Sequence, residues 1–232
     1  MTDTVKVVTT VAMQAVLEQL EPQFSEATGF GIEMAFGPPA RATEMVLKGE
    51  TADIVMTTPE GVTELATAGL VDASTSRVVV SMLMGAAVRA GAPKPDIGTV
   101  EAFKTAVLAA KSVTYANPEL GSPSARHFLK IAEQLGILDE VKAKSLVSSG
   151  LIARHVAAGE ADMAIQQLSE LRAVEGVEVI GQFPREIQNI VPLAAAIHTD
   201  SRHRDQAAEL IRLIASPATR PLIEDAGLLP AD

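Results

Sequence analysis

Short apolar stretches of two kinds alternate along almost the whole chain. One kind is rich in Val, Ile, Ala and Met, which is typical of buried β-strands. The other kind places apolar residues three and four positions apart, as Val16, Leu20 and Phe24 do, which predicts helices that pack on one face. This alternation predicts an α/β fold whose mixed, mainly parallel sheets are flanked by helices.

The predicted elements follow one another with few long interruptions. Strands are expected over residues 5–9, 32–36, 53–56, 78–88, 112–115, 144–147, 163–166, 177–181 and 191–198. Helices are expected over residues 13–28, 41–48, 61–68, 99–110, 151–158, 201–215 and 217–226, and another one ends at residue 135. Loops rich in Gly and Pro, such as residues 91–98, separate some of these elements.

One short phrase occurs twice. Gly-Glu-Thr-Ala-Asp-Ile-Val at residues 49–55 returns as Gly-Glu-Ala-Asp-Met-Ala-Ile at residues 159–165. Each copy follows a predicted helix and opens a predicted strand, which indicates two similar α/β lobes. The alternative is a common helix-to-strand connector, because Gly readily ends helices.

The order of elements predicts that the second lobe is inserted in the first. We expect residues 1–82 and 191–232 to form lobe 1, residues 83–190 to form lobe 2, and a ligand cleft to lie between them. The chain then crosses between the lobes twice, and residues 81–89 and 187–194 are the candidate hinges.

Composition excludes several classes of protein. The 232 residues carry a net charge of −10 without a basic cluster, and aromatic residues make up only 3%, so nucleic acid is not expected as a partner. No apolar run reaches the roughly 18 residues that span a bilayer, so direct membrane insertion is not expected either. Cysteine is absent, and His155, His198 and His203 show no metal-ligand spacing, so we expect neither a metal nor a cofactor.

The whole chain resembles the periplasmic molybdate-binding proteins, two-lobed (type II) solute-binding proteins of bacteria. The resemblance rests on the order of short motifs at residues 24–29, 36–39, 49–53, 69–72, 135–137, 159–162, 215–218 and 226–228. It implies a two-lobed fold with hinge bending, a small anionic ligand and, if the protein is exported, the membrane components of an ABC transporter as partner. If Met1 is the native start, we expect a cytoplasmic protein; if a signal peptide has been removed, we expect a periplasmic one.

The residues that serve the oxyanion in that family are mostly replaced. A serine of the family corresponds to Ala12, its Gly-Ser-Ser-Gly turn to residues 37–40 with Pro38 and Pro39, and its tyrosine to Gln167. A buried anion that loses hydrogen-bond donors costs several kcal/mol. An organic di- or tricarboxylate is therefore favoured over molybdate.

Lobe 1 offers candidate ligand groups at its predicted strand ends. Arg41, just after Pro39, can hold a planar carboxylate through two parallel hydrogen bonds; the alternative is an exposed arginine paired with Glu44 or Glu64. Thr9 and Thr10 end the first predicted strand, Ala12 lies at the start of the first helix, and Thr58 follows the third strand; with Pro39 of the turn they complete the candidate set of lobe 1. For Thr9 and Thr10 the alternative is capping of the first helix.

Lobe 2 offers a second set, at the helix that starts at Gly121-Ser122-Pro123-Ser124. Ser122 fits the N-cap and Pro123 the first helical position, so simple capping is the alternative to a site. Ser124 and Arg126 add further polar groups, and His127 lies one turn from the helix start; for this histidine the alternative is a hydrogen bond at the lobe surface. Of Gln166 and Gln167, which face opposite sides of a strand, Gln167 is favoured as the ligand group.

A second function is open on the same scaffold. The chain is similar to a branch of this fold that isomerises unsaturated tricarboxylates such as aconitate, through the Gly-Ser-Pro-Ser turn, the histidine after it, and Phe-Pro-Arg-Glu-Ile-Gln at residues 183–188. In that reading His127 is the tentative acid or base, and Arg41 with the helix start stabilises the dienolate. The sequence leaves a solute-binding protein and such an isomerase as the two alternatives.

Overall fold

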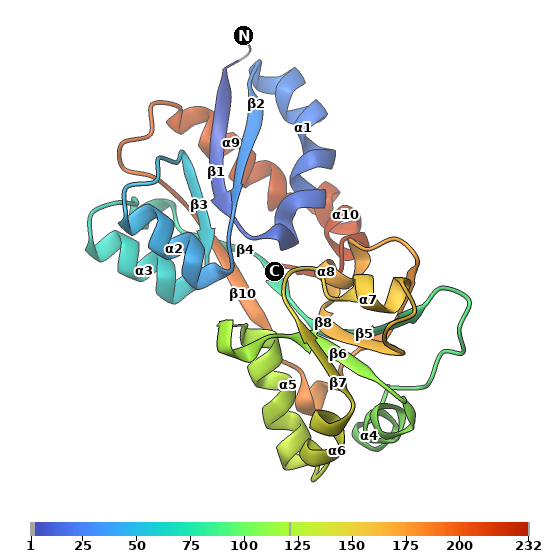
Figure 1. Ribbon diagram of the computed structural model, residues 1–232. Helices are drawn as coiled ribbons and strands as arrows, with labels where there is room; N and C mark the ends of the chain where they lie inside the picture. Colours follow the sequence, from blue (N-terminus) through green and yellow to red (C-terminus); the bar gives the residue numbers. More distant parts are fainter. Residues whose placement is uncertain (1–2, 121, 232) are drawn as a thin grey trace. The chain divides into compact units, whose positions relative to one another are not determined.

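The structure, a computed structural model, describes residues 3–120 and 122–231 (Figure 1). By their internal contacts the residues form two compact units. Unit 1 comprises Met1–Ser81 with Val191–Asp232, and unit 2 comprises Met82–Ile190. The chain therefore passes from one unit to the other at residues 81–82 and again at residues 190–191.

Unit 1 has a mixed six-stranded sheet in the order β11-β4-β10-β3-β1-β2. Its strands are β1 (Thr4–Thr9), β2 (Gly31–Phe36), β3 (Ile54–Thr57), β4 (Arg77–Met82), β10 (Val191–Ile197) and β11 (Leu228–Pro230). Its helices are α1 (Gln14–Thr28), α2 (Pro39–Leu47), α3 (Pro59–Thr67), α9 (Arg204–Ile214) and α10 (Arg220–Asp225), with short 3-10 helices η1 (Val11–Met13), η2 (Ala73–Thr75) and η5 (Pro217–Thr219). Strand β1 is parallel to β2 and β3, whereas β10 is antiparallel to β3.

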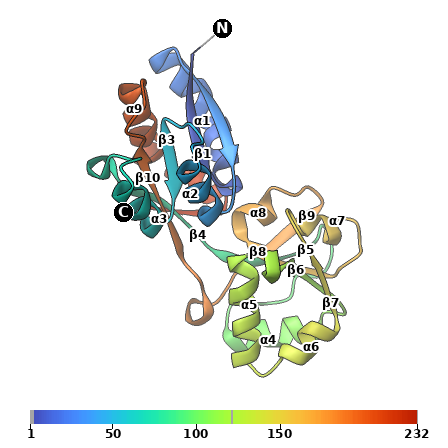
Figure 2. The ribbon, with the colours of Figure 1, turned by 60° about the vertical axis from the view of Figure 1, so that its left-hand side comes forward.

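Helices cover both faces of this sheet (Figures 1 and 2). Helices α1 and α9 pack together, and α2 and α3 pack together against β1, β3 and β10. Because strand side chains alternate, Val8 and Val55 face α2 and α3, where Val46 and Leu65 complete a core cluster. Apolar residues of the strand pattern and of the helix pattern thus pack against each other in one buried layer.

Unit 2 has a five-stranded sheet in the order β7-β6-β8-β5-β9. Its strands are β5 (Met84–Arg89), β6 (Val113–Ala116), β7 (Ser145–Ser148), β8 (Met163–Gln167) and β9 (Val177–Gln182). Its helices are α4 (Val100–Ala109), α5 (Pro123–Gln134), α6 (Leu138–Ala143), α7 (Ala153–Ala157) and α8 (Leu168–Arg172), with 3-10 helices η3 (Pro118–Leu120) and η4 (Arg185–Ile187). Strand β6 is parallel to β7 and β8, whereas β5 is antiparallel to β8 and β9.

The core of unit 2 lies between this sheet and its helices. Helices α4, α5 and α6 lie on one side, and α7 and α8 on the other (Figures 1 and 2). Aromatic pairs fill the first layer: the rings of Phe103 and Phe183 lie 4.6 Å apart, and those of Tyr115 and Phe128 lie 5.4 Å apart. The predicted α/β fold with helix-flanked mixed sheets is confirmed.

The repeated phrase builds the same connection in both units. Gly49 and Gly159 have positive φ values of 94° and 78°, and each ends a helix with the same pair of backbone bonds. The carboxylate of Asp53 then accepts the backbone N–H of Lys6 at 2.9 Å, and that of Asp162 accepts the N–H of Lys111 at 2.8 Å. In each unit an aspartate therefore ties the start of one strand to the chain of its parallel neighbour.

Three features differ from the sequence prediction. The expected single strand over residues 78–88 is two strands, β4 and β5, which are interrupted at Leu83 because they belong to different sheets. Residues 84–89 lie inside the sheet of unit 2, so this part of the candidate hinge 81–89 is wrong. The short elements α6, α8 and β11 were not predicted, because three to six residues are too few to show a periodicity.

We predict that Asp53→Ala lowers the free energy of unfolding more than Asp162→Ala does. Asp53 is buried and also accepts a hydrogen bond from the Ser201 hydroxyl at 2.6 Å, whereas Asp162 is exposed. We expect losses of about 2–4 kcal/mol and about 1 kcal/mol, measured by urea denaturation followed by circular dichroism. Equal losses would show that burial of the Asp53 network adds nothing.

Candidate functional site

The parallel strands of unit 1 bring three connections together at one edge of the sheet. Thr9 lies opposite Phe36 in the register of β1 and β2, and Val8 lies opposite Val55 in that of β1 and β3. The carboxyl ends of these strands lead into η1, α2 and α3. The Thr9 carbonyl also accepts the N–H of Gly37 at 3.0 Å, which fixes the turn before α2. Ligands of open α/β sheets commonly bind at such an edge.

The hydroxyls of Thr9 and Thr10 are buried here without a partner. Neither Oγ1 atom makes a hydrogen bond among the described residues, although both residues are almost completely buried. The alternative reading, capping of the first helix by one of these threonines, is not observed: Thr10 occupies the N-cap of η1 with extended backbone, but its side chain makes no cap bond, and the N-cap of α1 is Met13. Only the Thr10 carbonyl serves the turn, by accepting the N–H of Met13. Ala12 is buried beside them and brings no polar side-chain group.

The hydroxyls of Thr43 and Thr57 at this edge make hydrogen bonds within the unit. The Pro39 carbonyl accepts the hydroxyl of Thr57 at 2.8 Å, and the hydroxyls of Thr43 and Thr57 lie 2.9 Å apart. Gly61 sits against this pair, since a Cβ there would lie 2.5 Å from Thr43 Oγ1. Thr58 caps α3 by accepting the N–H of Gly61 at 3.2 Å, which leaves its own O–H free to donate.

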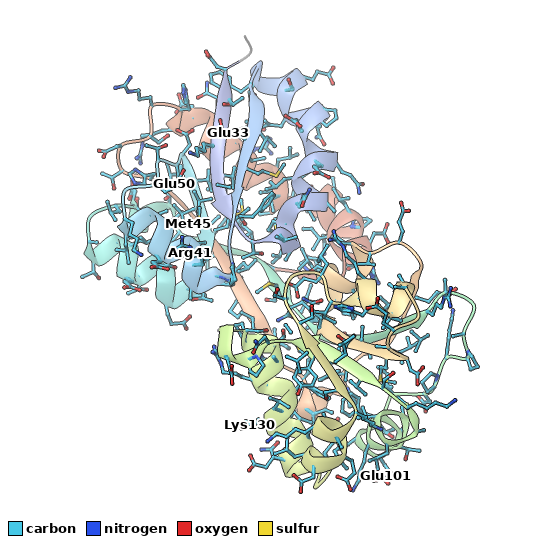
Figure 3. The ribbon with its side chains drawn as sticks, in the orientation of Figure 1. Glu33, Arg41, Met45, Glu50, Glu101 and Lys130 are labelled. Atoms are coloured by element: carbon cyan, nitrogen blue, oxygen red, sulfur yellow. The ribbon has the colours of Figure 1, made fainter. Side chains whose placement is uncertain are left out.

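Arg41 lies on the first turn of α2 (Figure 3). Its guanidinium donates to the carboxylate of Glu44 at 2.8 Å, and its side chain is 54% exposed. The neighbouring Lys48 and Arg41 lower the pKa of Glu44 to about 2, so this carboxylate stays charged at neutral pH. Of the two readings of Arg41, the exposed ion pair with Glu44 is the one that the structure contains.

In unit 2 the two neighbouring glutamines at the end of β8 have different surroundings. The Gln166 amide accepts the N–H of Ile152 and donates to the Gly150 carbonyl at 2.9 Å, so it holds the start of α7. The Gln167 side chain is buried, and its Oε1 has no partner among the described residues. The two side chains point to opposite faces of the sheet because they are consecutive in a strand.

The start of α5 forms its own cap. Ser122 accepts the N–H of Ala125 at 3.3 Å, and its hydroxyl lies 3.1 Å from that of the buried Ser124. Arg126 is exposed, and Gly121 of the predicted turn lies outside the described residues. The capping alternative therefore accounts for Ser122, whereas the hydroxyl of Ser124 contacts that of Ser122.

His127 joins α5 to the segment that precedes β10. Its Nε2 lies 2.8 Å from the Ile187 carbonyl and donates to it, which leaves Nδ1 as the only other ring nitrogen. The next residue of that segment, Gln188, bonds both backbone groups of Met84 at 2.8 and 3.0 Å. The Phe183–Gln188 segment is thus held at both sides, and His127 makes a structural hydrogen bond, as its alternative reading expected.

Glu170, in α8, is a functional candidate that the sequence reasoning missed. Burial raises its pKa to about 7, against the opposing effect of hydrogen bonds with the Gln167 backbone and the Gln166 side chain. A carboxyl group with such a pKa populates both protonation states near neutral pH. Its sequence signal is only a Glu three residues after the N-cap Gln167, which by itself indicates a helix start.

Metal-binding groups and membrane-spanning helices are both absent from residues 3–120 and 122–231. No group of three or more His, Asp or Glu residues is placed there to hold a metal ion. None of the helices in that part combines the length and the apolar character needed to span a bilayer.

The fold of each unit defines the class: the protein is α/β and periplasmic-binding-protein-like. It belongs to the bacterial extracellular solute-binding proteins, a family whose model matches residues 5–229. An aconitate isomerase from a Pseudomonas species is 32% identical over 233 residues, which cover 98% of this chain and 88% of that protein. The resemblance predicted from the sequence, including its isomerase branch, is confirmed.

Solved structures show the same fold at low identity. The periplasmic molybdate-binding protein of Azotobacter vinelandii has a TM-score of 0.76 and 18% identity, and covers 98% of this chain and 100% of its own. A substrate-binding domain from Clostridium difficile has a TM-score of 0.79 and 12% identity, covering 98% and 99%. These likenesses establish the architecture. The ligand has to be inferred from the residues of this chain.

We predict that Glu170→Gln stabilises the protein at alkaline pH. Because the native pKa of about 7 lies above the ordinary 4.5, the native state binds the proton more tightly than the unfolded state does. The resulting stabilisation is complete below pH 4.5 and is lost as the pH rises through 7. The advantage of Glu170→Gln over the wild type should therefore grow by about 3 kcal/mol between pH 4.5 and pH 8 in urea denaturation.

The matched control for this experiment is Glu175→Gln. Glu175 is exposed and follows the same helix, so its substitution should change the unfolding free energy by less than about 0.5 kcal/mol at either pH. A pH-independent difference between Glu170→Gln and the wild type would mean that burial does not perturb Glu170.

Proposed function

We propose that this protein binds a small organic anion with two or three carboxylate groups, and that polar side chains at the carboxyl ends of parallel strands contact it. The observation that carries this proposal is the set of buried, unpartnered polar atoms at the carboxyl ends of parallel strands: Thr9 Oγ1, Thr10 Oγ1 and Gln167 Oε1. A buried polar group without a partner costs about 1–3 kcal/mol, and a ligand that hydrogen-bonds to it removes this cost.

The chemistry of these groups favours a carboxylate over a tetrahedral oxyanion. The two threonine hydroxyls donate hydrogen bonds, and the Gln167 amide provides a donor and an acceptor at its two ends. Pro38 and Pro39 lack N–H groups, so the turn before α2 contributes few donors. Ala12 likewise contributes no side-chain donor. A dehydrated oxyanion needs more donors than this set supplies, whereas an organic acid also presents carbon atoms and hydroxyls.

We propose that ligand binding is accompanied by bending near residues 81–82 and 190–191, where the chain passes from one unit to the other. Outside the cytoplasm, the membrane components of a transporter would receive the bound ligand. Inside the cytoplasm, the same binding would serve sensing or catalysis.

A second candidate function is the isomerisation of an unsaturated polycarboxylate. Two observations favour it: the 32% identical relative is an aconitate isomerase, and Glu170 has a pKa near neutrality beside Gln167. Moving a double bond next to a carboxylate requires a group that takes up and returns a proton. Incubation with aconitate, followed by ¹H NMR of its vinylic protons, tests for turnover directly.

A thermal-shift screen tests the binding proposal. Molybdate, sulfate, citrate and aconitate are compared at equal concentration, and we expect the polycarboxylates alone to raise the melting temperature, because a ligand bound only by the native state stabilises it. Stabilisation by molybdate or sulfate without any effect of the organic acids would overturn the proposed ligand class.

We predict that Thr10→Val weakens polycarboxylate binding about 5- to 30-fold, since one hydrogen bond worth about 1–2 kcal/mol is lost, as measured by isothermal titration calorimetry. The ligand-free protein should keep its stability or gain up to about 1 kcal/mol, because an unpartnered hydroxyl is replaced by an isosteric apolar group. Thr114→Val is the matched control, because Thr114 Oγ1 is buried and unpartnered inside β6. Equal affinities of the two variants would show that Thr10 does not contact the ligand.

We predict a smaller effect for Arg41→Ala, less than about tenfold in affinity. Its guanidinium is half exposed and already paired with Glu44, and such surface pairs contribute about 0–1 kcal/mol. The same calorimetric titration measures it. A larger loss would show that Arg41 leaves Glu44 and holds a ligand carboxylate, which is the other reading of this residue.

A further inference from the structure

We propose that Gln188 is a positioning residue for ligand binding. Through the backbone of Met84 it fixes the position of Gln167, whose buried side chain is one of the proposed ligand groups. This inference deepens the proposed function and rests on it. Gln188 lies in the segment between β9 and β10, and it acts through Met84 without contacting the ligand itself.

The side-chain amide of Gln188 spends its whole hydrogen-bonding capacity on backbone groups. Its Oε1 accepts the N–H of Met84 at 2.8 Å and that of Asn189 at 2.9 Å. Its Nε2 donates to the carbonyl of Met84 at 3.0 Å and to that of Phe183 at 3.3 Å. A side-chain amide has two N–H donors and an oxygen with two lone pairs, so these four partners saturate it. Gln188 therefore fixes the main chain around it.

These bonds continue the pairing of β5 beyond the end of β9. Strand β9 ends at Gln182, and the N–H of the next residue, Phe183, still donates to the Met84 carbonyl at 3.0 Å. The N–H of Met84 donates to the Gln188 side chain. The amide of Gln188 thus takes the place that a further residue of β9 would occupy beside Met84.

Met84 in turn lies directly opposite Gln167 in the antiparallel register of β5 and β8. The N–H of Leu168 donates to the Leu83 carbonyl at 2.8 Å, so Leu83 and Leu168 form the hydrogen-bonded pair, and Met84 and Gln167 form the non-hydrogen-bonded pair beside it. In such a pair the two side chains leave the same face of the sheet and lie especially close together. Both side chains are buried, so a shift of Met84 displaces the neighbour of Gln167.

Close packing leaves the adjoining part of β5 little room to move. A Cβ on Gly85 would lie 2.2 Å from Leu168 Cδ2 and 2.7 Å from the carbonyl oxygen of Gly181. Met84 is therefore held on one side by the packing at Gly85 and on another by the amide of Gln188. The saturated amide and the close packing together define where the end of β8 presents its side chain.

The same amide ties together two places where the chain passes from one unit to the other. Met84 comes just after the passage at residues 81–82, and Gln188 comes just before the passage at residues 190–191. Their hydrogen bonds lie within unit 2 and join the two segments. We infer that the chain can bend at these passages without displacing Gln167, because the bonds between Met84 and Gln188 separate the passages from the strand end.

A double-mutant cycle tests this inference, with aconitate as the ligand and isothermal titration calorimetry as the measurement. The variants are Gln188→Met, Gln167→Ala and the two changes combined. Methionine is similar to glutamine in length and makes none of the four hydrogen bonds. We expect Gln188→Met to weaken aconitate binding about 5- to 30-fold. The matched control is Gln182→Ala, an exposed glutamine at the end of β9, which should change the affinity less than about twofold.

The coupling between the two positions is a readout that a purely structural role would not change. In the Gln167→Ala background, Gln188→Met should weaken binding less than about twofold further, because the side chain that Gln188 positions is already gone. A role in stability alone would lower the free energy of unfolding in both backgrounds and leave the affinity unchanged. Urea denaturation of each variant measures this stability.

Two results would overturn the inference. One is an affinity of Gln188→Met within about twofold of the wild type, and the other is a loss that is as large in the Gln167→Ala background as in the wild type. If circular dichroism shows that Gln188→Met does not fold, Gln188→Asn takes its place in the same cycle. The asparagine amide is one methylene shorter, so it should not bond both backbone groups of Met84.

Failure of this inference is distinguishable from failure of the proposed function. If Gln167→Ala weakens aconitate binding and Gln188→Met does not, this inference alone fails. If Gln167→Ala binds aconitate as the wild type does, Gln167 is not a ligand group, and its assignment fails together with the role of Gln188. If the wild type binds no polycarboxylate in the thermal-shift screen, the proposed ligand class fails, and Gln188 has no ligand group to position.

Discussion

One interaction at the start of a strand orders each unit of this protein. In unit 1 the carboxylate of Asp53 accepts the backbone N–H of Lys6, and in unit 2 that of Asp162 accepts the N–H of Lys111. The aspartate that follows the helix-ending Gly is thus fixed to the chain of the parallel neighbour. Because side chains alternate along a strand, this register decides which residues reach the core and where the strands end. The candidate ligand groups Thr9 and Gln167 lie at the opposite ends of the strands that these aspartates tie together.

The polar residues at the strand ends are of two kinds. Some complete the fold: Thr43 and Thr57 bond each other and Pro39, and Gln166 holds the start of α7. Others are buried without a partner, and Gln167 differs from Gln166 in this respect although the two are adjacent. Burying an unsatisfied polar group costs about 1–3 kcal/mol, and the unpartnered groups at the strand ends are the ones that we propose a ligand contacts.

Charge plays a different part from the one that the sequence suggests. Arg41 and His127 are the conspicuous cation and acid–base residues of the chain, yet Arg41 is paired with Glu44 and His127 with the Ile187 carbonyl. The group whose protonation is tuned is Glu170, because burial penalises its charged form. The buried, unpartnered side chains of Thr9, Thr10 and Gln167 are neutral, so the binding that we propose rests on hydrogen bonds to neutral groups.

The sequence by itself determined the α/β class, the family resemblance, the repeated Gly–Asp connection and most strands and helices, because these depend on local periodicity and on glycine at helix ends. Only the tertiary structure decided that residues 78–88 form two strands, that Thr9 and Thr10 cap no helix, and that Glu170 has a raised pKa. The physical reason is that pairing, partners and burial are set by groups distant in sequence. A threonine or a glutamate looks the same in the sequence whether its side chain is solvated, bonded or buried alone.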